Sequence, residues 1–359
     1  MKAIRAAALV GIVLAGCGGQ PPEADTATSE EALTAQECTG ATLFATETFR
    51  GNGRTCLTCH SAGTGTVSPK DVEERFNNIE NGTIDSLFRS IDSDTGTGSS
   101  YTRLRTRATI RVTIPLPSRI RLANNPSATT VTFARGIPTT LNIGLDPELM
   151  YDGRAHGLVD QANGAIRAHF QPGRAATTTE LSAIAAFEKT LFSSRAMQAY
   201  SKGGPAPVLP AGGTASEKRG RTVFDNNCGF CHGGPLLDSP DPTSDSGPVR
   251  FSNVQVSEFN EGNLPNLKWL VTNTDGTKSI LYSPDPGRAL ILNDPNNDHW
   301  NEFKTPSLLN IKNTAPYFHD NSSLTLQDVA NHYSRFNALF QPPFTEQEKS
   351  DLVAFLKLL

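Results

Sequence analysis

Two segments of the chain share one pattern of polar and apolar positions. Residues 177–191 (TTTELSAIAAFEKTL) and 345–359 (TEQEKSDLVAFLKLL) each begin with a threonine and have a glutamate three residues later, and apolar residues then recur at helical spacing. The threonine and the glutamate form the signature of a helix N-terminus. The pattern therefore predicts two amphipathic helices, 168 residues apart.

The repeat continues upstream at the same offset. Residues 138–143 (PTTLNI) match residues 306–311 (PSLLNI), and an aspartate follows each match nine residues later, Asp152 and Asp320. The chain is thus expected to consist of two similar units, each ending in an amphipathic helix.

The length of the chain also favours two domains. A chain of 359 residues exceeds what one hydrophobic core usually supports. Residues 202–216, rich in glycine and proline, are expected to link an N-terminal domain (residues 39–201) to a C-terminal domain (residues 217–359). Residues 236–301 are dense in Pro, Asp, Asn and Gly, which predicts extended loop with a short hairpin around residues 267–282.

The N-terminus has the pattern of an export signal. Two positive charges in the first five residues precede an apolar run too short to span a bilayer. Leu14-Ala15-Gly16-Cys17 is similar to the lipobox of bacterial lipoproteins, although an ordinary signal peptide with an incidental cysteine is the alternative. We expect a signal peptide over residues 1–17, acylation of Cys17, and a flexible tether over residues 18–38. The protein would then be lipid-anchored on the periplasmic side of a bacterial membrane.

Composition narrows the class of partner. The hydrophobic fraction of 37% and charged fraction of 19% are typical of a soluble globular protein. The net charge of -4 and the absence of any run of Lys and Arg argue against nucleic acid as a partner.

Four of the six cysteines lie in two Cys-x-x-Cys-His motifs, which are typical of c-type haem attachment. Two thiols about one helical turn apart add to the vinyl groups of one porphyrin, and the adjacent imidazole reaches the iron. Zinc ribbons and redox disulfides are the alternatives, but zinc ribbons place their second pair within about 20 residues. We expect two covalently bound haems c, held by Cys56, Cys59 and His60 and by Cys228, Cys231 and His232. Cys38 falls outside both motifs and is expected to pack as a small apolar side chain.

The repeat predicts different sixth ligands for the two haems. Tyr333 follows Asp320 by 13 residues, and Ala165 follows Asp152 by the same number. Because alanine cannot bind iron, the first haem is expected to keep a vacant face while the phenolate of Tyr333 caps the second. A vacant iron suits peroxide or oxygen chemistry, and a capped iron suits electron transfer. The alternative is that Tyr333 is a packed core aromatic.

These residues resemble the bacterial di-haem cytochrome c peroxidase and MauG family over roughly residues 40–359. The resemblance is carried by residues 49–56 (FRGNGRTC), 151–155 (YDGRA), 303–306 (FKTP) and 314–320 (TAPYFHD). It implies a mainly α fold of two cytochrome-c-like helical domains with long irregular loops. It also implies a peroxidatic N-terminal haem and an electron-transfer C-terminal haem.

The resemblance further implies roles for single residues. The position of Tyr333 is methionine in the peroxidases and tyrosine in MauG-like enzymes, which oxidise residues of a partner protein. Tyr151 stands where the family usually places a tryptophan between the haems. A calcium ion between the haems would take backbone carbonyls of Thr314 and Pro316, with Asn124 as a third candidate.

The distal pocket of the first haem departs from the family. Gln161 matches a glutamine of the peroxide site, but Gln171 stands where the family has an acidic residue. Glutamine cannot act as a general base, whereas His169 can near neutral pH. His169 is also a candidate ligand for the first iron, or a surface histidine. No histidine in the loop before Pro138 matches the removable ligand of typical peroxidases, so we expect no reductive activation.

The leading interpretation is an oxidoreductase that reduces hydrogen peroxide at the first haem. Electrons would pass through the second haem from a small electron-donor protein or from a side chain of a protein substrate. The alternatives are a non-catalytic electron-transfer cytochrome in which His169 ligates the first iron, and an oxygenase acting on an exported apolar substrate.

Overall fold

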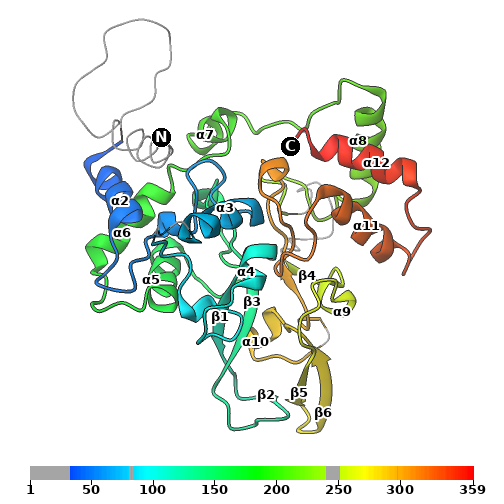
Figure 1. Ribbon diagram of the computed structural model, residues 1–359. Helices are drawn as coiled ribbons and strands as arrows, with labels where there is room; N and C mark the ends of the chain where they lie inside the picture. The colour runs from blue at the N-terminus through cyan, green and yellow to red at the C-terminus, as the bar shows by residue number, and fades with distance from the viewer. Residues whose placement is uncertain (1–32, 81, 83, 240–250, 297) are drawn as a thin grey trace, which may run out of the picture.

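The computed structural model describes residues 33–80, 82, 84–239, 251–296 and 298–359 (Figure 1). The predicted signal peptide, the acylation site Cys17 and most of the predicted tether lie outside these ranges. The fold is mainly helical, as predicted, with 37% helix and 13% strand.

The α-helices are α2 (Ala35–Thr46), α3 (Pro69–Glu80), α4 (Thr102–Arg107), α5 (Leu158–His169), α6 (Thr178–Glu188), α7 (Arg195–Ser201), α8 (Ala215–Asn227), α9 (Val256–Phe259), α10 (Arg288–Leu292), α11 (Leu326–Asn337) and α12 (Glu346–Leu356). The 3-10 turns are η1 (Cys56–Thr58), η2 (Ser90–Asp92), η3 (Ile143–Leu145) and η4 (Ile311–Asn313). The strands are β1 (Thr109–Pro115), β2 (Ile120–Leu122), β3 (Thr130–Gly136), β4 (Phe251–Ser252), β5 (Leu267–Thr272), β6 (Lys278–Ser283) and β7 (Phe303–Lys304).

The two predicted closing helices are confirmed as α6 and α12. The side chains of Thr177 and Thr345 accept hydrogen bonds from the backbone of Glu180 and Glu348, whose carboxylates bond back to the caps. The same device starts α2 after Thr34 and α8 after Thr214. Helix therefore begins inside the predicted tether and inside the predicted linker, earlier than the composition of those segments suggested.

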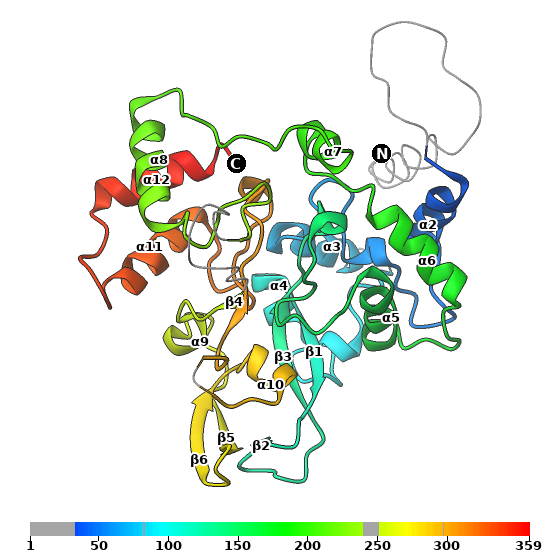
Figure 2. The same cartoon turned by 180° about the vertical axis from the view of Figure 1, so that it is seen from behind.

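In each half, the first helix packs on the closing helix through a glycine (Figures 1 and 2). A Cβ on Gly40 of α2 would collide with the carbonyl oxygen of Ala183 in α6. A Cβ on Gly220 of α8 would collide with the carbonyl oxygen of Asp351, which is Ala183 moved by the repeat of 168 residues. The two halves therefore repeat each other in packing as well as in sequence.

The strands join the two halves. β1 pairs with β3 within the N-terminal half, a hairpin that the sequence patterns did not predict. β5 and β6 form the hairpin predicted around residues 267–282, and β2 from the N-terminal half pairs with β5. A central core accordingly combines residues from both halves, including Val112, Phe133, Trp269 and Trp300.

Two further expectations concern the cysteines and the membrane. Cys38 is disulfide-bonded, so the expectation that it packs as a simple apolar side chain is wrong. Among the described helices, none has the length and apolar character that crossing a bilayer requires.

Candidate functional site

The first Cys-x-x-Cys-His motif forms the tight turn η1. The backbone N–H of His60 donates to the carbonyl of Cys56 at 3.0 Å, which folds the imidazole back over the turn. The His60 Nδ1 lies 2.7 Å from the carbonyl oxygen of Gly65. Because a carbonyl only accepts, Nδ1 carries the proton and Nε2 keeps its lone pair. Burial lowers the pKa of His60, which keeps the ring neutral and ready to bind iron.

The second motif repeats this geometry at the end of α8. The N–H of His232 donates to the carbonyl of Cys228 at 2.8 Å, and its Nδ1 lies 2.8 Å from the carbonyl oxygen of Leu237. Burial lowers the pKa of His232 to about 4. Both histidines therefore present a neutral ring with an unprotonated Nε2.

The four motif thiols are free and half-buried. Burial raises the pKa of each of them, so they remain neutral thiols in this chain. No group of three or more metal-binding side chains of the His, Cys, Asp or Glu type occurs in the described part of the chain, which leaves the zinc alternative without a ligand set. The motifs thus fit covalent haem c.

Three candidate residues share one face of α5. Gln161, Ala165 and His169 follow one another at intervals of four residues, so their side chains point the same way. Burial lowers the pKa of His169 to about 4, an effect that the charge on Asp92 opposes and that a charged His60 would strengthen. The Nδ1 of His169 is buried without a hydrogen-bond partner among the described residues. α5 therefore places a neutral imidazole near the ring of His60.

Gln171 lies apart from this face. It is exposed, has a positive φ of 48°, and its amide oxygen accepts from Asn52 Nδ2 at 3.2 Å. The same Asn52 nitrogen donates to the carbonyl of His169 at 2.9 Å. Gln171 and Asn52 thus fasten the end of α5 at the surface.

Tyr333 lies beside the second motif. Burial raises its pKa, and charges on Cys228 and Cys231 would raise it further, which places the hydroxyl near both thiols. Its ring packs against Phe318 and Phe336, with centroids 6.0 and 6.3 Å away. Tyr333 is therefore both a core aromatic and a candidate ligand.

Tyr151 lies where the two halves meet. Its carbonyl accepts from the N–H of Lys304 at 2.7 Å, and burial raises the pKa of its hydroxyl. Next to it, Asp152 pairs with the buried guanidinium of Arg135 at 2.6 Å, and Arg135 also pairs with Asp285 at 2.7 Å. Sequence reasoning singled out Asp152 but missed Arg135 and Asp285, since nothing in a lone strand arginine indicates a partner 150 residues away.

The three calcium candidates are not brought together. The neighbour of Asn124, Ala123, donates to the carbonyl of Lys268 in β5, and β2 and β5 lie at the lower end of the molecule in Figure 1. Thr314 and Pro316 lie between η4 and α11, which is far from that end. A shared calcium site with Asn124 therefore gains no support.

A buried carboxyl beside the first motif was also missed. Glu188, the last residue of α6, is 4% exposed, and its Oε2 has no partner among the described residues. Burial raises its pKa to about 8, and its charge would raise the pKa of Cys56. The signal was available, because the repeat places the apolar Leu356 at the same position.

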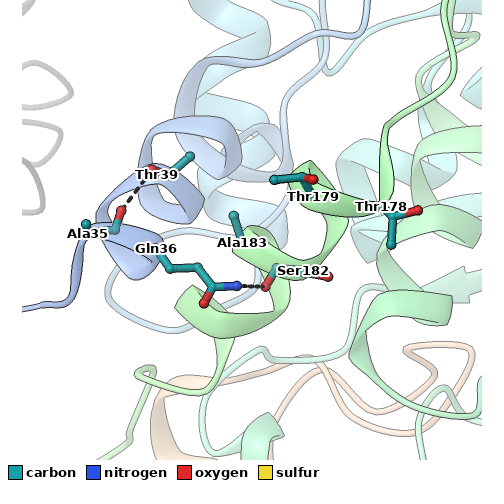
Figure 3. A pocket seen from close by; sticks show the side chains of 7 residues that line it. All are labelled: Ala35, Gln36, Thr39, Thr178, Thr179, Ser182 and Ala183. Carbon is teal, nitrogen blue, oxygen red and sulfur yellow. Dashed lines mark hydrogen bonds between the residues drawn. The ribbon is translucent and has the colours of Figure 1, made fainter.

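A shallow surface groove of about 470 Å³ lies between α2 and α6 (Figure 3). It carries no titratable side chain, and its position on the outer helices separates it from the haem motifs. Its lining is Ala35, Gln36, Thr39, Thr178, Thr179, Ser182 and Ala183.

Comparisons with known proteins agree with this site. Cytochrome-c peroxidase IdrP1 of Denitromonas iodatirespirans is 28% identical over 199 residues, 51% of this chain and 50% of that protein. Cytochrome c551 peroxidase of Nitrosomonas europaea is 27% identical over 253 residues, 62% of this chain and 64% of that protein. The chain spans about half the length of the first two curated relatives that it matches. No protein-family model matches it.

The fold agrees as well. A crystal structure of a MauG-like protein associated with microbial copper homeostasis superposes with a TM-score of 0.53 over 95% of this chain and 94% of that one, at 21% identity. The named relatives are cytochrome c peroxidases, which are oxidoreductases. The predicted resemblance to the bacterial di-haem cytochrome c peroxidase and MauG family is therefore confirmed, in sequence by the peroxidases and in fold by the MauG-like protein.

Proposed function

We propose that this chain is a di-haem c-type oxidoreductase that reduces hydrogen peroxide at the haem attached to Cys56 and Cys59. Electrons reach it through the haem attached to Cys228 and Cys231, from a small donor protein. The observation that carries the proposal is the difference between two equivalent helices, because α5 has alanine where α11 has Tyr333. An iron with an open face supplies peroxide reduction, and an iron with two protein ligands supplies electron transfer.

The side chains of α5 divide the remaining work. His169 is neutral above pH 4 and accepts the proton that peroxide must lose. The half-buried Gln161 amide, two turns earlier on the same face, orients the substrate through hydrogen bonds. Gln171, at the surface, only supports the helix end.

Each half forms a cytochrome-c-like domain around its own haem. Tyr151, at the contact between the halves, is the aromatic group through which electrons pass. The lipobox at Cys17 anchors the protein on the periplasmic side of a membrane. Calcium, if bound, takes carbonyls of Thr314 and Pro316.

A second candidate function rests on His169. Its buried, partnerless Nδ1 can bind the first iron, which would make the chain an electron-transfer cytochrome. A third follows from the tyrosine at position 333, as in MauG-like proteins that oxidise a partner protein.

Spectroscopy of the purified diferric holoprotein tests the proposal. A high-spin ferric component that disappears on adding one equivalent of peroxide supports it. Two low-spin irons, indifferent to cyanide and peroxide, would leave the electron-transfer cytochrome in its place.

A further inference from the structure

Buried polar atoms without partners gather at one place in the described structure. Ten such side-chain atoms occur there, and six of them belong to five residues on the contact between the halves. We call these five residues the interface cluster: Arg103, Thr109, His319, Ser322 and Ser323. A buried donor without a partner costs about 1–3 kcal/mol, so this concentration indicates a missing occupant.

The cluster is built from two segments. One is α4 and the start of β1, and the other is the loop of residues 319–323. Arg107 donates to the carbonyl of Ser322 at 2.6 Å, and Asn321 Nδ2 donates to the carbonyl of Arg107 at 2.7 Å. The N–H of Gly136, which pairs with Thr109, donates to the carbonyl of His319 at 2.8 Å. These bonds fix both segments together and leave the side-chain donors of the cluster unused.

The charges of the site favour an anion. Arg103 and Arg107 face one buried carboxylate, Asp320, whose Oδ1 accepts from the N–H of Ser322. The exposed Asp94 is already bonded to backbone N–H groups at the start of α4. The Nε and Nη2 of Arg103 form a fork of the kind that binds a carboxylate with two hydrogen bonds. Two arginines would repel a calcium ion.

The cluster adjoins the pocket of the second haem. Phe318, next to His319, stacks at 4.4 Å on His332 and at 6.0 Å on Tyr333. On the other wall, Arg103 Nη1 donates to the carbonyl of Gly262 at 3.4 Å. The chain around Gly262 and Phe318 thus connects the cluster to the residues that surround Cys228 and Cys231.

We propose that Arg103, with the hydroxyls of Ser322 and Ser323, binds a propionate carboxylate of the haem attached to Cys228 and Cys231. This rests on the proposed attachment of that haem. A residue of the N-terminal half then sets the electrostatic environment of the C-terminal haem. Arg103 is a positioning residue, since its guanidinium acts on the iron only through the propionate.

The test is the Arg103→Gln holoprotein, with the midpoint potential of the second haem as the readout. Loss of a partly buried positive charge stabilises the ferric state, so the equilibrium constant for reduction falls about tenfold, or about 59 mV. The propionate bending mode in resonance Raman spectra shifts as well. Arg105→Gln is the matched control, because Arg105 lies on the same helix but pairs with Glu73 at the surface.

Further variants separate the outcomes. Arg103→Lys keeps the charge but not the fork, so the potential is retained while the propionate mode shifts. If Arg103→Gln does not fold, Ser322→Ala gives the same Raman readout without a charge change. A potential of the unchanged protein that follows added acetate or phosphate identifies a free anion as the occupant and overturns the proposal, as does a potential in Arg103→Gln equal to that in Arg105→Gln. None of these readouts needs peroxide, so an inactive enzyme would sink the proposed function and leave this inference standing.

Discussion

Ala165 and Tyr333 occupy the same position of two equivalent twelve-residue helices, α5 and α11, 168 residues apart. The equivalence extends to the backbone around them. The N–H of Asn142 donates to the carbonyl of Leu191 at 2.7 Å, and the N–H of Asn310 donates to the carbonyl of Leu359 at 2.9 Å, at the same offset. The difference between alanine and tyrosine is therefore a change of side chain on a conserved frame within one chain.

Replacing Tyr333 by phenylalanine tests its role as a ligand. The ring would keep its contacts with Phe318 and Phe336, so the protein folds, but no oxygen remains to bind iron. We expect the electron paramagnetic resonance signal of the second haem to change while that of the first stays the same. Tyr317→Phe is the control, since that hydroxyl donates to the carbonyl of Ile311. Unchanged spectra in Tyr333→Phe would mean that Tyr333 is only a core aromatic.

His169→Gln tests the proton acceptor. General base catalysis typically contributes about 10²–10⁴-fold, so kcat/KM for peroxide should fall by that factor. Because burial lowers the pKa of His169 to about 4, the unchanged protein should keep its activity well below pH 6.5 and lose it only near pH 4. The exposed His156→Gln serves as control.

The outcome also separates the two roles proposed for His169. If the first iron is low-spin in the unchanged protein and becomes high-spin in His169→Gln, the imidazole is its ligand. Full peroxidase activity in the variant would exclude both roles.

How far the sequence predicts this structure depends on whether a feature is local. The capping threonines, the haem motifs and the repeat could be read directly, because each depends on residues close in sequence or on an internal copy. The pairing of β2 with β5 could not, because these strands are 150 residues apart and short. Arg135 and Asp285 were missed for the same reason.

The candidate site shows the same division. The spacing of the helix predicted that Gln161 and His169 share a face, whereas the surface position of Gln171 depends on the turn of the chain after α5. Glu188 was readable by comparing the halves, since a carboxyl replaces Leu356 at a core position.

Glu188 should make stability depend on pH. Its folded pKa of about 8 lies above the ordinary value of 4.5, so between these values the folded state holds a proton that the unfolded state releases. The contribution is complete below about pH 4.5 and is lost as the pH rises through 8. One pKa unit corresponds to about 1.4 kcal/mol, so the expected loss is on the order of a few kcal/mol.

Denaturant unfolding of the holoprotein at several pH values measures this effect. Glu188→Gln should flatten the pH profile, and Glu188→Leu, which copies Leu356 of the other half, should also stabilise the protein at neutral pH. Glu346→Gln, at an exposed carboxyl, should leave the profile as it is. A Glu188→Gln profile that matches the unchanged protein would mean that this carboxyl is not protonated in the fold.

Two glycine-to-alanine substitutions should have opposite effects on stability. In Gly220→Ala the new methyl group meets the backbone carbonyl of Asp351, which cannot move aside as a flexible side chain can, so α8 and α12 must separate. Such overpacking costs about 1–3 kcal/mol. In Gly164→Ala, in the middle of α5, a methyl group meets nothing within 4 Å, and the gain in helix propensity is about 0.5–1 kcal/mol. Thermal unfolding of both variants checks the pair; if Gly220→Ala were as stable as Gly164→Ala, the close crossing of α8 and α12 would be refuted, and with it the packing repeat that relates the two halves.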